Sequence, residues 1–493
     1  MSVPAPTVPD RSAPRRRRWS LSLRGVMGVI LVAGGLAGWW ARAATLRREA
    51  VAAIRAGGGY VAFADDPGYE DRAGAWTWLY RWTGVEACRG VARVSYEGPA
   101  TKPPPPIGVS APPEPTPDVA FREFGRLGRL ERLREVESRG TAITPSDLRE
   151  LAGARVGGLA LHGLPAVTAP LLAEVGRIDG PERLTLGTRA ATFDPRLLTP
   201  AAGLGRLKDL RLYGFARPGS ADLAALGDLP ATRTLALSPA PSDDAYLDRV
   251  GTAGQLVALD LRETRIGDAG LRRLVARSPG LEAITLDGSA LTDAGVEALA
   301  TLPRPRSVDL AGRFGARPDG VLTDASLVAL GRARGLARLH LNAGHFTDRG
   351  IDALRGLPLR ELRLGSVEAL AAPALARLMA SRGFEFLGLR GPAITDATVA
   401  TLAAGVRGRL ALDLSDSAIT DAAMPALATI SLSELCLVRT GITDRGLVAL
   451  GPVPTLASLT LWETPVTPAG AATWRATHRF GSLAVGPIPE DLR

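Results

Sequence analysis

The residues best suited to catalysis or metal binding are few in this sequence of 493 residues, and they lie far apart. They are His162, His340, His345, His478, Cys88 and Cys436. The two cysteines form no CxxC pair and neither lysine stands in a phosphate-binding GxxxxGK[ST] loop, which argues against a zinc cluster and a nucleotide site. The densest group is His340 and His345 in one segment, which could form a hydrolytic or metal site with Asp309. The simpler interpretation, solvent-facing polar residues, is favoured, so we predict no catalytic residue, no metal and no cofactor.

Recognition chemistry has more candidates, because charged and aromatic residues recur next to leucines in L-x-L motifs. In a strand with this alternation the leucines face one side and their neighbours face the other. Twelve neighbours form a candidate binding face: Arg211, Tyr213, Asp260, Arg262, Asp287, Asp309, His340, Asn342, Arg363, Arg390, Asp413 and Trp462. Arginine and aromatic side chains among satisfied polar groups are typical of protein-binding surfaces. An exposed sheet face also needs polar residues to stay soluble, so a purely structural interpretation of these residues remains open.

Repeats of one motif, L-x-x-L-x-L-x-x-[ST]-x-I-[TG]-D-x-G-[LV]-x-x-L, must position these side chains. Clear copies begin at Leu256, Leu281 and Leu432. Fifteen central strand residues follow one another at steps of 23–26 residues with a single step of 31: Val136, Leu159, Leu184, Leu210, Leu235, Leu259, Ile284, Val308, Leu339, Leu362, Leu387, Leu412, Leu435, Leu459 and Leu483. The period of two predicts a strand, and the later helical spacing with a Thr or Asp cap predicts a short helix. One unit cannot bury its own leucines, so we expect the units to stack.

These copies resemble leucine-rich repeats of the ribonuclease-inhibitor-like and cysteine-containing type, which carry ITDAGL on the outer helix. The resemblance implies an α/β right-handed solenoid of about 15 repeats over residues 120–493, with a parallel concave sheet and convex helices. The chain departs from many such proteins in having Asn342 as its only asparagine, so no buried asparagine ladder can follow the strands. Hydroxyl residues stand there and we expect them to bond loop backbone: Thr264, Ser289, Ser417, Thr440 and Thr464.

The amino-terminal segment carries a membrane signal. Residues 1–55 hold ten arginines against Asp10 and Glu49, so +8 of the net charge of +9 lies there. The rest of the chain is nearly neutral, which argues against a nucleic-acid partner. The uncharged residues 25–41 would span about 26 Å as a helix, close to the ~30 Å thickness of a bilayer core.

We expect this segment to be a transmembrane anchor that continues as a helix to residue 56. The excess of arginines before it predicts that the basic head, residues 1–24, stays in the cytoplasm and that the repeats are outside. A cleaved signal peptide with a small-x-small site at residues 41–43 is one alternative, and a buried or peripheral helix is another.

Residues 57–119 are expected to form an amino-terminal cap. Their patterns predict strands at 60–63 and 91–96 and a Trp-rich helix at 73–83. Nine prolines within residues 99–117 predict an exposed, polyproline-like insertion.

The cap also contains a candidate extra repeat. Val94 and Tyr96 match the L-x-L positions, so we expect residues 91–96 to be its strand and residues 118–130 its convex helix. In the middle of the array, the 31-residue step predicts an additional surface loop at residues 311–321.

The layout as a whole resembles membrane-anchored bacterial leucine-rich-repeat proteins, which share an Arg-rich head, a short apolar anchor and an REAVAAI helix, here residues 48–54. This resemblance implies the fold, the membrane topology and, for function, a binding module. Together with the lack of catalytic motifs and the polar concave face, it leads us to expect a non-enzymatic scaffold in the cell membrane. We expect it to be displayed on the outer side of a bacterial cytoplasmic membrane and to bind an unidentified protein on its concave sheet. The alternative is a receptor for an envelope glycan that uses Tyr213 and Trp462 as stacking platforms. An aromatic content of 5%, with two aromatic residues on the predicted face, favours the protein partner.

Overall fold

The structure of the chain is a computed structural model. It describes residues 23–56, 59–63, 91–97, 117–139, 143–188, 204–214, 231–238, 247, 255–262, 266–286, 291–310, 322–342, 344–380, 383–451, 453–477 and 482–488. The predictions for the first 22 residues, the Trp-rich helix, the loop at 311–321 and all but the last residue of the proline-rich insertion lie outside this part of the chain.

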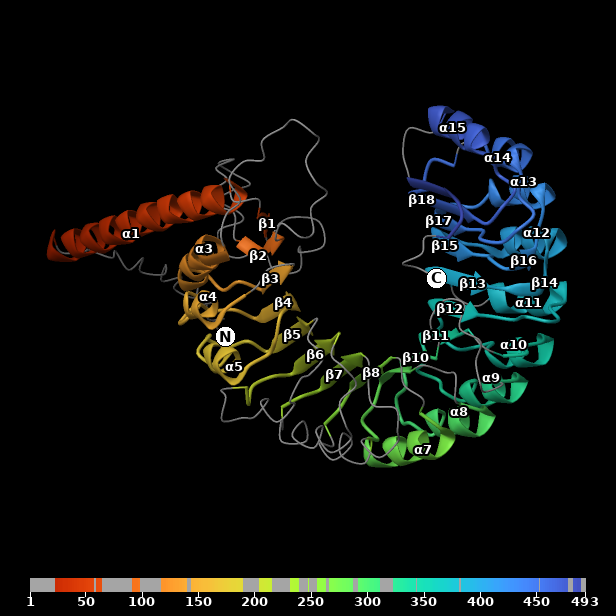
Figure 1. Ribbon diagram of the computed structural model, residues 1–493, viewed down its shortest axis with the longest axis horizontal. Helices are drawn as coiled ribbons and strands as arrows, with labels where there is room; N and C mark the ends of the chain where they lie inside the picture. Colours follow the sequence, from red (N-terminus) through yellow and green to blue (C-terminus); the bar gives the residue numbers. More distant parts are fainter. Residues whose placement is uncertain are drawn as a thin grey trace, which may run out of the picture.

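The repeats form an arc with one long sheet on its inner side and short helices on its outer side (Figure 1). Among the described residues the sheet has 17 strands. They are β1 (Tyr60–Phe63), β2 (Val91–Glu97), β3 (Glu135–Arg139), β4 (Gly158–Leu164), β5 (Arg183–Thr188), β6 (Asp209–Tyr213), β7 (Thr234–Ser238), β8 (Ala258–Leu261), β9 (Ala283–Leu286), β10 (Ser307–Asp309), β11 (Arg338–Leu341), β12 (Glu361–Leu364), β13 (Phe386–Leu389), β15 (Leu410–Asp413), β17 (Leu432–Cys436), β18 (Ser458–Trp462) and β19 (Ser482–Gly486). Each strand pairs with the next in this order, antiparallel for β1 with β2 and parallel for every later pair.

The register of the sheet matches the sequence alignment at every repeat. Val136 of β3 pairs with Leu159 of β4, and each of the fifteen central residues pairs with the next, as far as Leu483 of β19. Fourteen of the fifteen are buried in one continuous core, and Leu483 is half-buried because no later strand among the described residues covers it. The predicted leucine-rich-repeat solenoid is confirmed.

The outer side of the arc is formed by short helices, one for most repeats. They are α4 (Pro145–Arg149), α5 (Ala169–Val175), α7 (Asp268–Arg277), α8 (Asp293–Leu299), α9 (Asp324–Leu330), α10 (Asp348–Ala353), α11 (Ala372–Met379), α12 (Asp396–Gly405), η10 (Asp421–Ala423) with α13 (Met424–Leu427), α14 (Asp444–Leu450) and α15 (Pro468–Thr477). A two-stranded sheet of β14 (Gly391–Thr395) and β16 (Ser417–Ala418) links two of the turns that lead into these helices.

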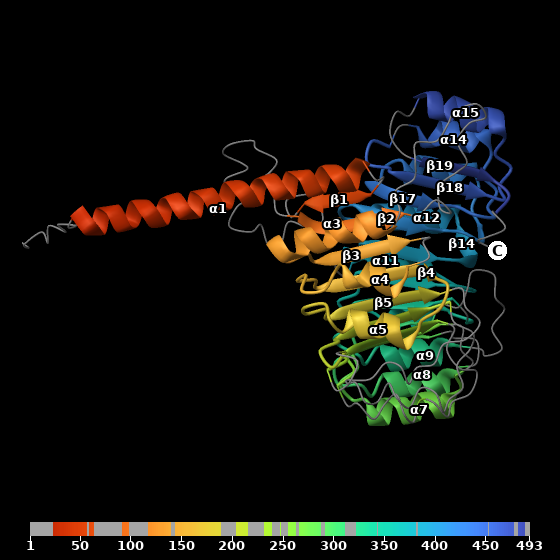
Figure 2. The same ribbon diagram turned by 60° about the vertical axis from the view of Figure 1, so that its left-hand side comes forward.

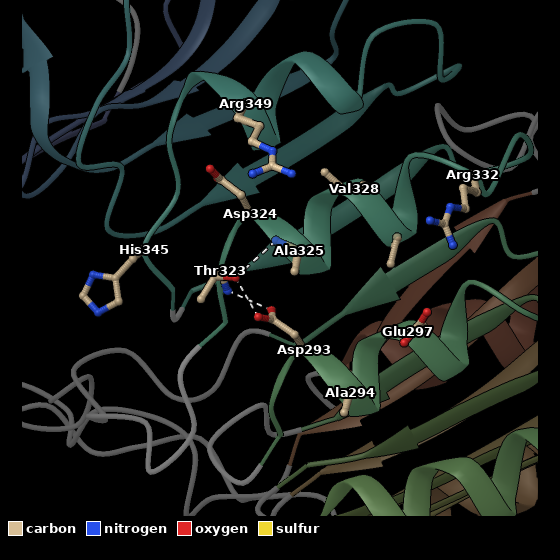
Figure 3. Close-up of a pocket in the computed structure, with 11 residues that line it drawn as sticks. Asp293, Ala294, Glu297, Thr323, Asp324, Ala325, Val328, Arg332, His345 and Arg349 are labelled. Atoms are coloured by element: carbon tan, nitrogen blue, oxygen red, sulfur yellow. Dashed lines mark hydrogen bonds between the residues drawn. The ribbon is translucent and has the colours of Figure 1, made fainter.

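The repeated Thr-Asp sequence at the helix starts joins each repeat to the next. The carboxylate of Asp268, at the start of α7, accepts hydrogen bonds from the backbone N–H and the hydroxyl of Thr292, 2.9 and 2.6 Å away in the following repeat. Figure 3 shows the next pair, Asp293 with Thr323. The same two bonds recur in the pairs Asp324–Thr347, Asp396–Thr420, Asp421–Thr443 and Asp444–Thr467. The motif therefore does more than cap a helix, which was its expected role.

The glycine of the T-D-x-G sequence leaves room for this joint. A Cβ on Gly295 would lie 2.3 Å from Oδ1 of Asp268, and equally close contacts would arise at Gly350, Gly446 and Gly470. Where serine replaces the glycine, Ser326 instead donates a hydrogen bond to Asp293. Burial tends to raise the pKa of Asp293, but the hydrogen bonds from Ser326 and Thr323 outweigh it and hold that pKa below the ordinary value.

Hydroxyl groups bond the loops that follow the strands, as the sequence predicts. Three of the five hydroxyls lie in the described part of the chain, and each donates to the carbonyl of the leucine three residues before it. The pairs are Ser417–Leu414 at 2.6 Å, Thr440–Leu437 at 2.8 Å and Thr464–Leu461 at 2.8 Å.

The amino-terminal cap is an extra repeat docked on the array. Val94 of β2 pairs with Val136 of β3 in the same register as the later repeats. The helix α3 (Pro117–Leu130) covers the outer side, with Phe121, Phe124 and Leu127 fully buried. The predicted strands at 60–63 and 91–96 and the helix at 118–130 are therefore confirmed.

A single 34-residue helix, α1 (Leu23–Ala56), precedes the cap. Its carboxyl-terminal half packs against α3, where Ala50 and Ile54 are buried and Arg47 forms an ion pair of 2.9 Å with Glu131. Its amino-terminal half projects away from the solenoid (Figure 2). No helix among the residues whose side chains the structure describes has both the length and the apolar character needed to cross a membrane.

Candidate functional site

The inner surface of the arc presents two rows of side chains. In each strand two leucines, or equivalent apolar residues, point into the core. The central row contains the residue between these two core-facing residues, and the edge row contains the residue that follows the second of them. The predicted residues of the central row are Arg211, Asp260, Asp309, His340, Arg363 and Asp413. Those of the edge row are Tyr213, Arg262, Asn342, Arg390 and Trp462, and Asp287 lies outside the described residues.

Most charges on these rows have partners within the protein. Arg211 pairs with Asp209 on its own strand at 3.0 Å, and Arg262 pairs with Asp260 at 3.2 Å. Burial raises the pKa of Asp260 above its ordinary value even though the charge of Arg262 lowers it. Burial likewise raises the pKa of Tyr213, so its hydroxyl is a neutral hydrogen-bonding group. The paired residues present a surface of mixed polarity and little local net charge.

Arg390 and Asp413 lie on the predicted face but are buried. Their side chains are 13% and 4% exposed and form an ion pair of 2.6 Å between neighbouring strands. Burial tends to raise the pKa of Asp413, but the charge and hydrogen bonds of Arg390, with hydrogen bonds from Ser415, hold it below the ordinary value. This pair holds β13 to β15 and offers a partner little accessible surface.

A ladder of alternating charges continues from this pair along the edge of the sheet. Asp416 lies 3.8 Å from Arg390 and 2.5 Å from Arg439, and Arg439 lies 3.5 Å from Glu463. Asp416, Arg439 and Glu463 occupy the same position in successive repeats and share a left-handed backbone with φ near +55°. The sequence interpretation missed this ladder, although the alternating sign at one repeat position is a signal that could have revealed it.

The centre of the concave face holds a cluster of His340, Asp309, Glu361, Arg363 and Phe386. The His340 ring lies between two carboxylates, with Nδ1 3.5 Å from Asp309 and Nε2 3.7 Å from Glu361. The Arg363 guanidinium stacks over the Phe386 ring with 4.7 Å between the guanidinium carbon and the ring centroid. The sequence prediction did not include Glu361 and Phe386, which come directly before the first core-facing leucine of their strands. The alternation of the strand directs this position to the concave face as well.

The structure offers no support for a reactive centre in the part of the chain it describes. No group of three or more potential metal ligands occurs among these residues. His345 pairs with Glu368 and lines a groove on the convex side, whereas His340 is on the concave strand β11, so the two histidines do not share a site. Burial raises the pKa of the Cys436 thiol, and so does the charge of Asp413, so this cysteine stays protonated.

The convex groove is a weaker candidate than the concave face. It encloses about 590 Å³ between α8, α9 and the start of α10 (Figure 3). Its floor contains Asp293, Thr323 and Asp324, whose polar atoms already form the joints between repeats. Few unsatisfied groups therefore remain there for a ligand.

The two predicted aromatic platforms lie too far apart to act together. Tyr213 is on β6 and Trp462 is on β18, ten strand steps away in the sheet. At a spacing of about 4.8 Å per strand they are separated by roughly 50 Å along the surface. A short sugar chain cannot contact both.

No protein-family model and no curated protein sequence matches this chain. Solved structures with similarity include a leucine-rich-repeat protein of Leptospira interrogans, at 16% identity and a TM-score of 0.36, covering 73% of this chain and 91% of that one. An internalin of Listeria monocytogenes is 17% identical with a TM-score of 0.34, covering 68% and 82%. A TLR13–ssRNA13 complex is 16% identical with a TM-score of 0.40, covering 76% and 52%.

Proposed function

We propose that this protein is a non-enzymatic scaffold that binds a protein partner on the concave face of its repeats. The observation that carries the proposal is the central cluster, where a stacked arginine, a histidine and two carboxylates lie on an inner surface formed by the paired strands β10 to β13. Arginine and aromatic side chains on a rigid surface are typical of binding hot spots.

We further propose that residues 25–41 anchor the chain in a bacterial cytoplasmic membrane, with the repeats on the outer side. The basis is the uncharged stretch between two arginine-rich flanks, together with the projection of that part of α1 from the solenoid (Figure 2). Because α1 is continuous and packs against α3, the anchor would hold the solenoid in a fixed orientation near the bilayer.

Reporter fusions test the topology. Alkaline phosphatase, which folds actively only outside the cytoplasm, should be active when it is joined after residue 63 or after residue 488. A fluorescent protein that needs the cytoplasm should be bright only when it is joined before residue 24. The opposite result at the carboxyl-terminal fusion would contradict the exported arrangement.

Single substitutions test the concave face. Arg262→Ala should change the free energy of unfolding by less than about 0.5 kcal/mol, because its side chain is exposed. Trp462 is half-buried, so Trp462→Ala should cost more, about 1–2 kcal/mol, without unfolding the array. At least one of them should weaken capture of the crosslinked partner from a cell-envelope extract by about 1–2 kcal/mol. Arg272→Ala and Arg273→Ala on the convex helix α7 are the matched controls and should leave capture unchanged. Loss of capture in the α7 variants alone would place the interface on the other side.

A further inference from the structure

Arg363 differs from the other arginines of the two concave rows. Four of these arginines have a carboxylate partner within 3.2 Å, in the pairs Arg139–Glu137, Arg211–Asp209, Arg262–Asp260 and Arg390–Asp413. Arg363 has no carboxylate partner among the described residues, and its Nε atom is buried without a hydrogen bond. No carboxylate among the described residues therefore lies within ion-pair distance of the Arg363 guanidinium.

The Arg363 side chain is held in place by its neighbours on the next strand. It runs from β12 across Gly388, where a Cβ would lie 3.2 Å from Cγ of Arg363 and 3.2 Å from the Phe386 ring. The guanidinium then rests on Phe386. Stacking of this kind fixes the plane of a guanidinium and leaves its N–H edges free for hydrogen bonds.

The surface around this guanidinium is formed by small residues. Gly365 follows in the edge row of the same strand, Gly388 is its neighbour in the central row, and Ala411 lies beside Phe386 on β15. The two glycines have no side chain and the alanine methyl group is too short to cover Arg363. A planar ligand group can therefore approach the two terminal Nη groups, which unlike Nε are not buried, from the inner side of the arc.

We propose that Arg363, stacked on Phe386, binds a carboxylate of an acidic side chain of the protein partner. A bidentate arginine–carboxylate contact is the strongest hydrogen-bonded pair that this geometry allows. Asp309 and Glu361 lie no more than two strands, about 10 Å, from the strand of Arg363. Their negative charges repel an extended polyanion such as a nucleic acid. The same acidic pair favours a basic residue of the partner next to its carboxylate. This inference rests on the proposed function, because it names the chemistry of the partner at the same face.

Peptide pairs that differ by one charge provide the test. The probes are arrayed 12-residue peptides with an Asp or Glu beside an Arg or Lys, each matched to a twin in which the acid is replaced by Asn or Gln. The full chain in detergent should bind some acidic peptides at least about tenfold more tightly than their amide twins, as expected for one charge-assisted pair. In Arg363→Gln this ratio should fall to about one, while Arg272→Gln, which changes an exposed arginine on the convex helix α7, should leave it unchanged.

A second variant separates the stacking from the charge. Phe386→Leu keeps the guanidinium but releases it, so the acid-to-amide ratio should fall only part of the way. Thermal unfolding of each variant checks that the fold is retained.

The outcomes distinguish this inference from the proposed function. If acidic peptides and their amide twins bind equally well, or if the acid-to-amide ratio is unchanged in Arg363→Gln, the carboxylate site is wrong. Neither result contradicts the proposed binding of a protein partner. Displacement of every peptide by single-stranded DNA at a lower concentration would overturn the choice of a protein carboxylate. Absence of any retained peptide, together with no crosslinked partner on the concave face, would overturn both.

Discussion

Asp413→Ala should lower the free energy of unfolding by about 3–5 kcal/mol, more than any other single change on the concave face. The substitution removes the carboxylate that compensates Arg390, whose side chain is only 13% exposed. Only the more exposed Asp416, 3.8 Å away, remains near the buried guanidinium, so most of the cost of its desolvation is no longer offset. It also leaves the backbone N–H of Ser415 without the acceptor that Asp413 provides at 3.1 Å. Chemical denaturation of both proteins measures the difference.

The matched control is Asp260→Ala, which breaks an ion pair of the same type on the same face. Its partner Arg262 is 61% exposed, so water replaces the lost carboxylate and the cost should stay below about 1 kcal/mol. Equal losses for the two variants would contradict the structural role of the buried pair.

The pH dependence of the same pair has a definite sign. The pKa of Asp413 in the folded protein is below its ordinary value, so the folded state binds this proton less readily than the unfolded state. The stabilisation is therefore present above the ordinary pKa, about 4, and is lost as the pH falls through the lower, folded-state value. Over that range the stability of the native protein and that of Asp413→Ala should converge.

The array could be predicted from the sequence because each repeat carries the same signal. A leucine period of two and a repeat length of 23–26 residues specify strand, register and stacking together, so Val136 and Leu483 could be aligned across the whole chain. The joint between Asp268 and Thr292 could not be found in the same way. Both residues belong to a helix start in their own repeat, and their contact appears only when two repeats are stacked.

The sequence could predict which residues lie on the concave face, but not which of their charged side chains form ion pairs. Strand alternation places Arg211 and Arg363 on the inner face, and the strand pairings Arg211–Ala236 and His340–Arg363 reproduce this. Whether an arginine there is paired and exposed, paired and buried, or stacked depends on which side chains flank it on adjacent strands. Phe386 and Gly388 decide this for Arg363, and neither matches a recognition motif in the sequence.

Gly125→Ala in α3 should destabilise the protein by about 2–3 kcal/mol, although the same change in a helix normally stabilises. A Cβ at this position would lie 2.0 Å from the carbonyl oxygen of Glu150, at the end of α4. Because that oxygen belongs to the backbone and also accepts a hydrogen bond from Arg129 at 3.2 Å, the clash cannot be relieved by rotating a side chain. The helix α3 must move outward, which uncovers the fully buried Phe121.

Gly38→Ala in α1 is the control that isolates the contact. It makes the identical replacement inside a helix at a position where a Cβ meets no atom within 4 Å, so it should leave stability unchanged or raise it slightly. Gly125→Ala should therefore unfold at a lower temperature than the native protein and Gly38→Ala at the same or a slightly higher one. Limited proteolysis of Gly125→Ala should cut near the cap before the later repeats. A rise in melting temperature for both variants would mean that α3 does not pack tightly on α4. In that case α1 and the cap would be held to the solenoid mainly through the strand pair β2–β3, and the fixed orientation that we propose for the repeats above the membrane would lose part of its support.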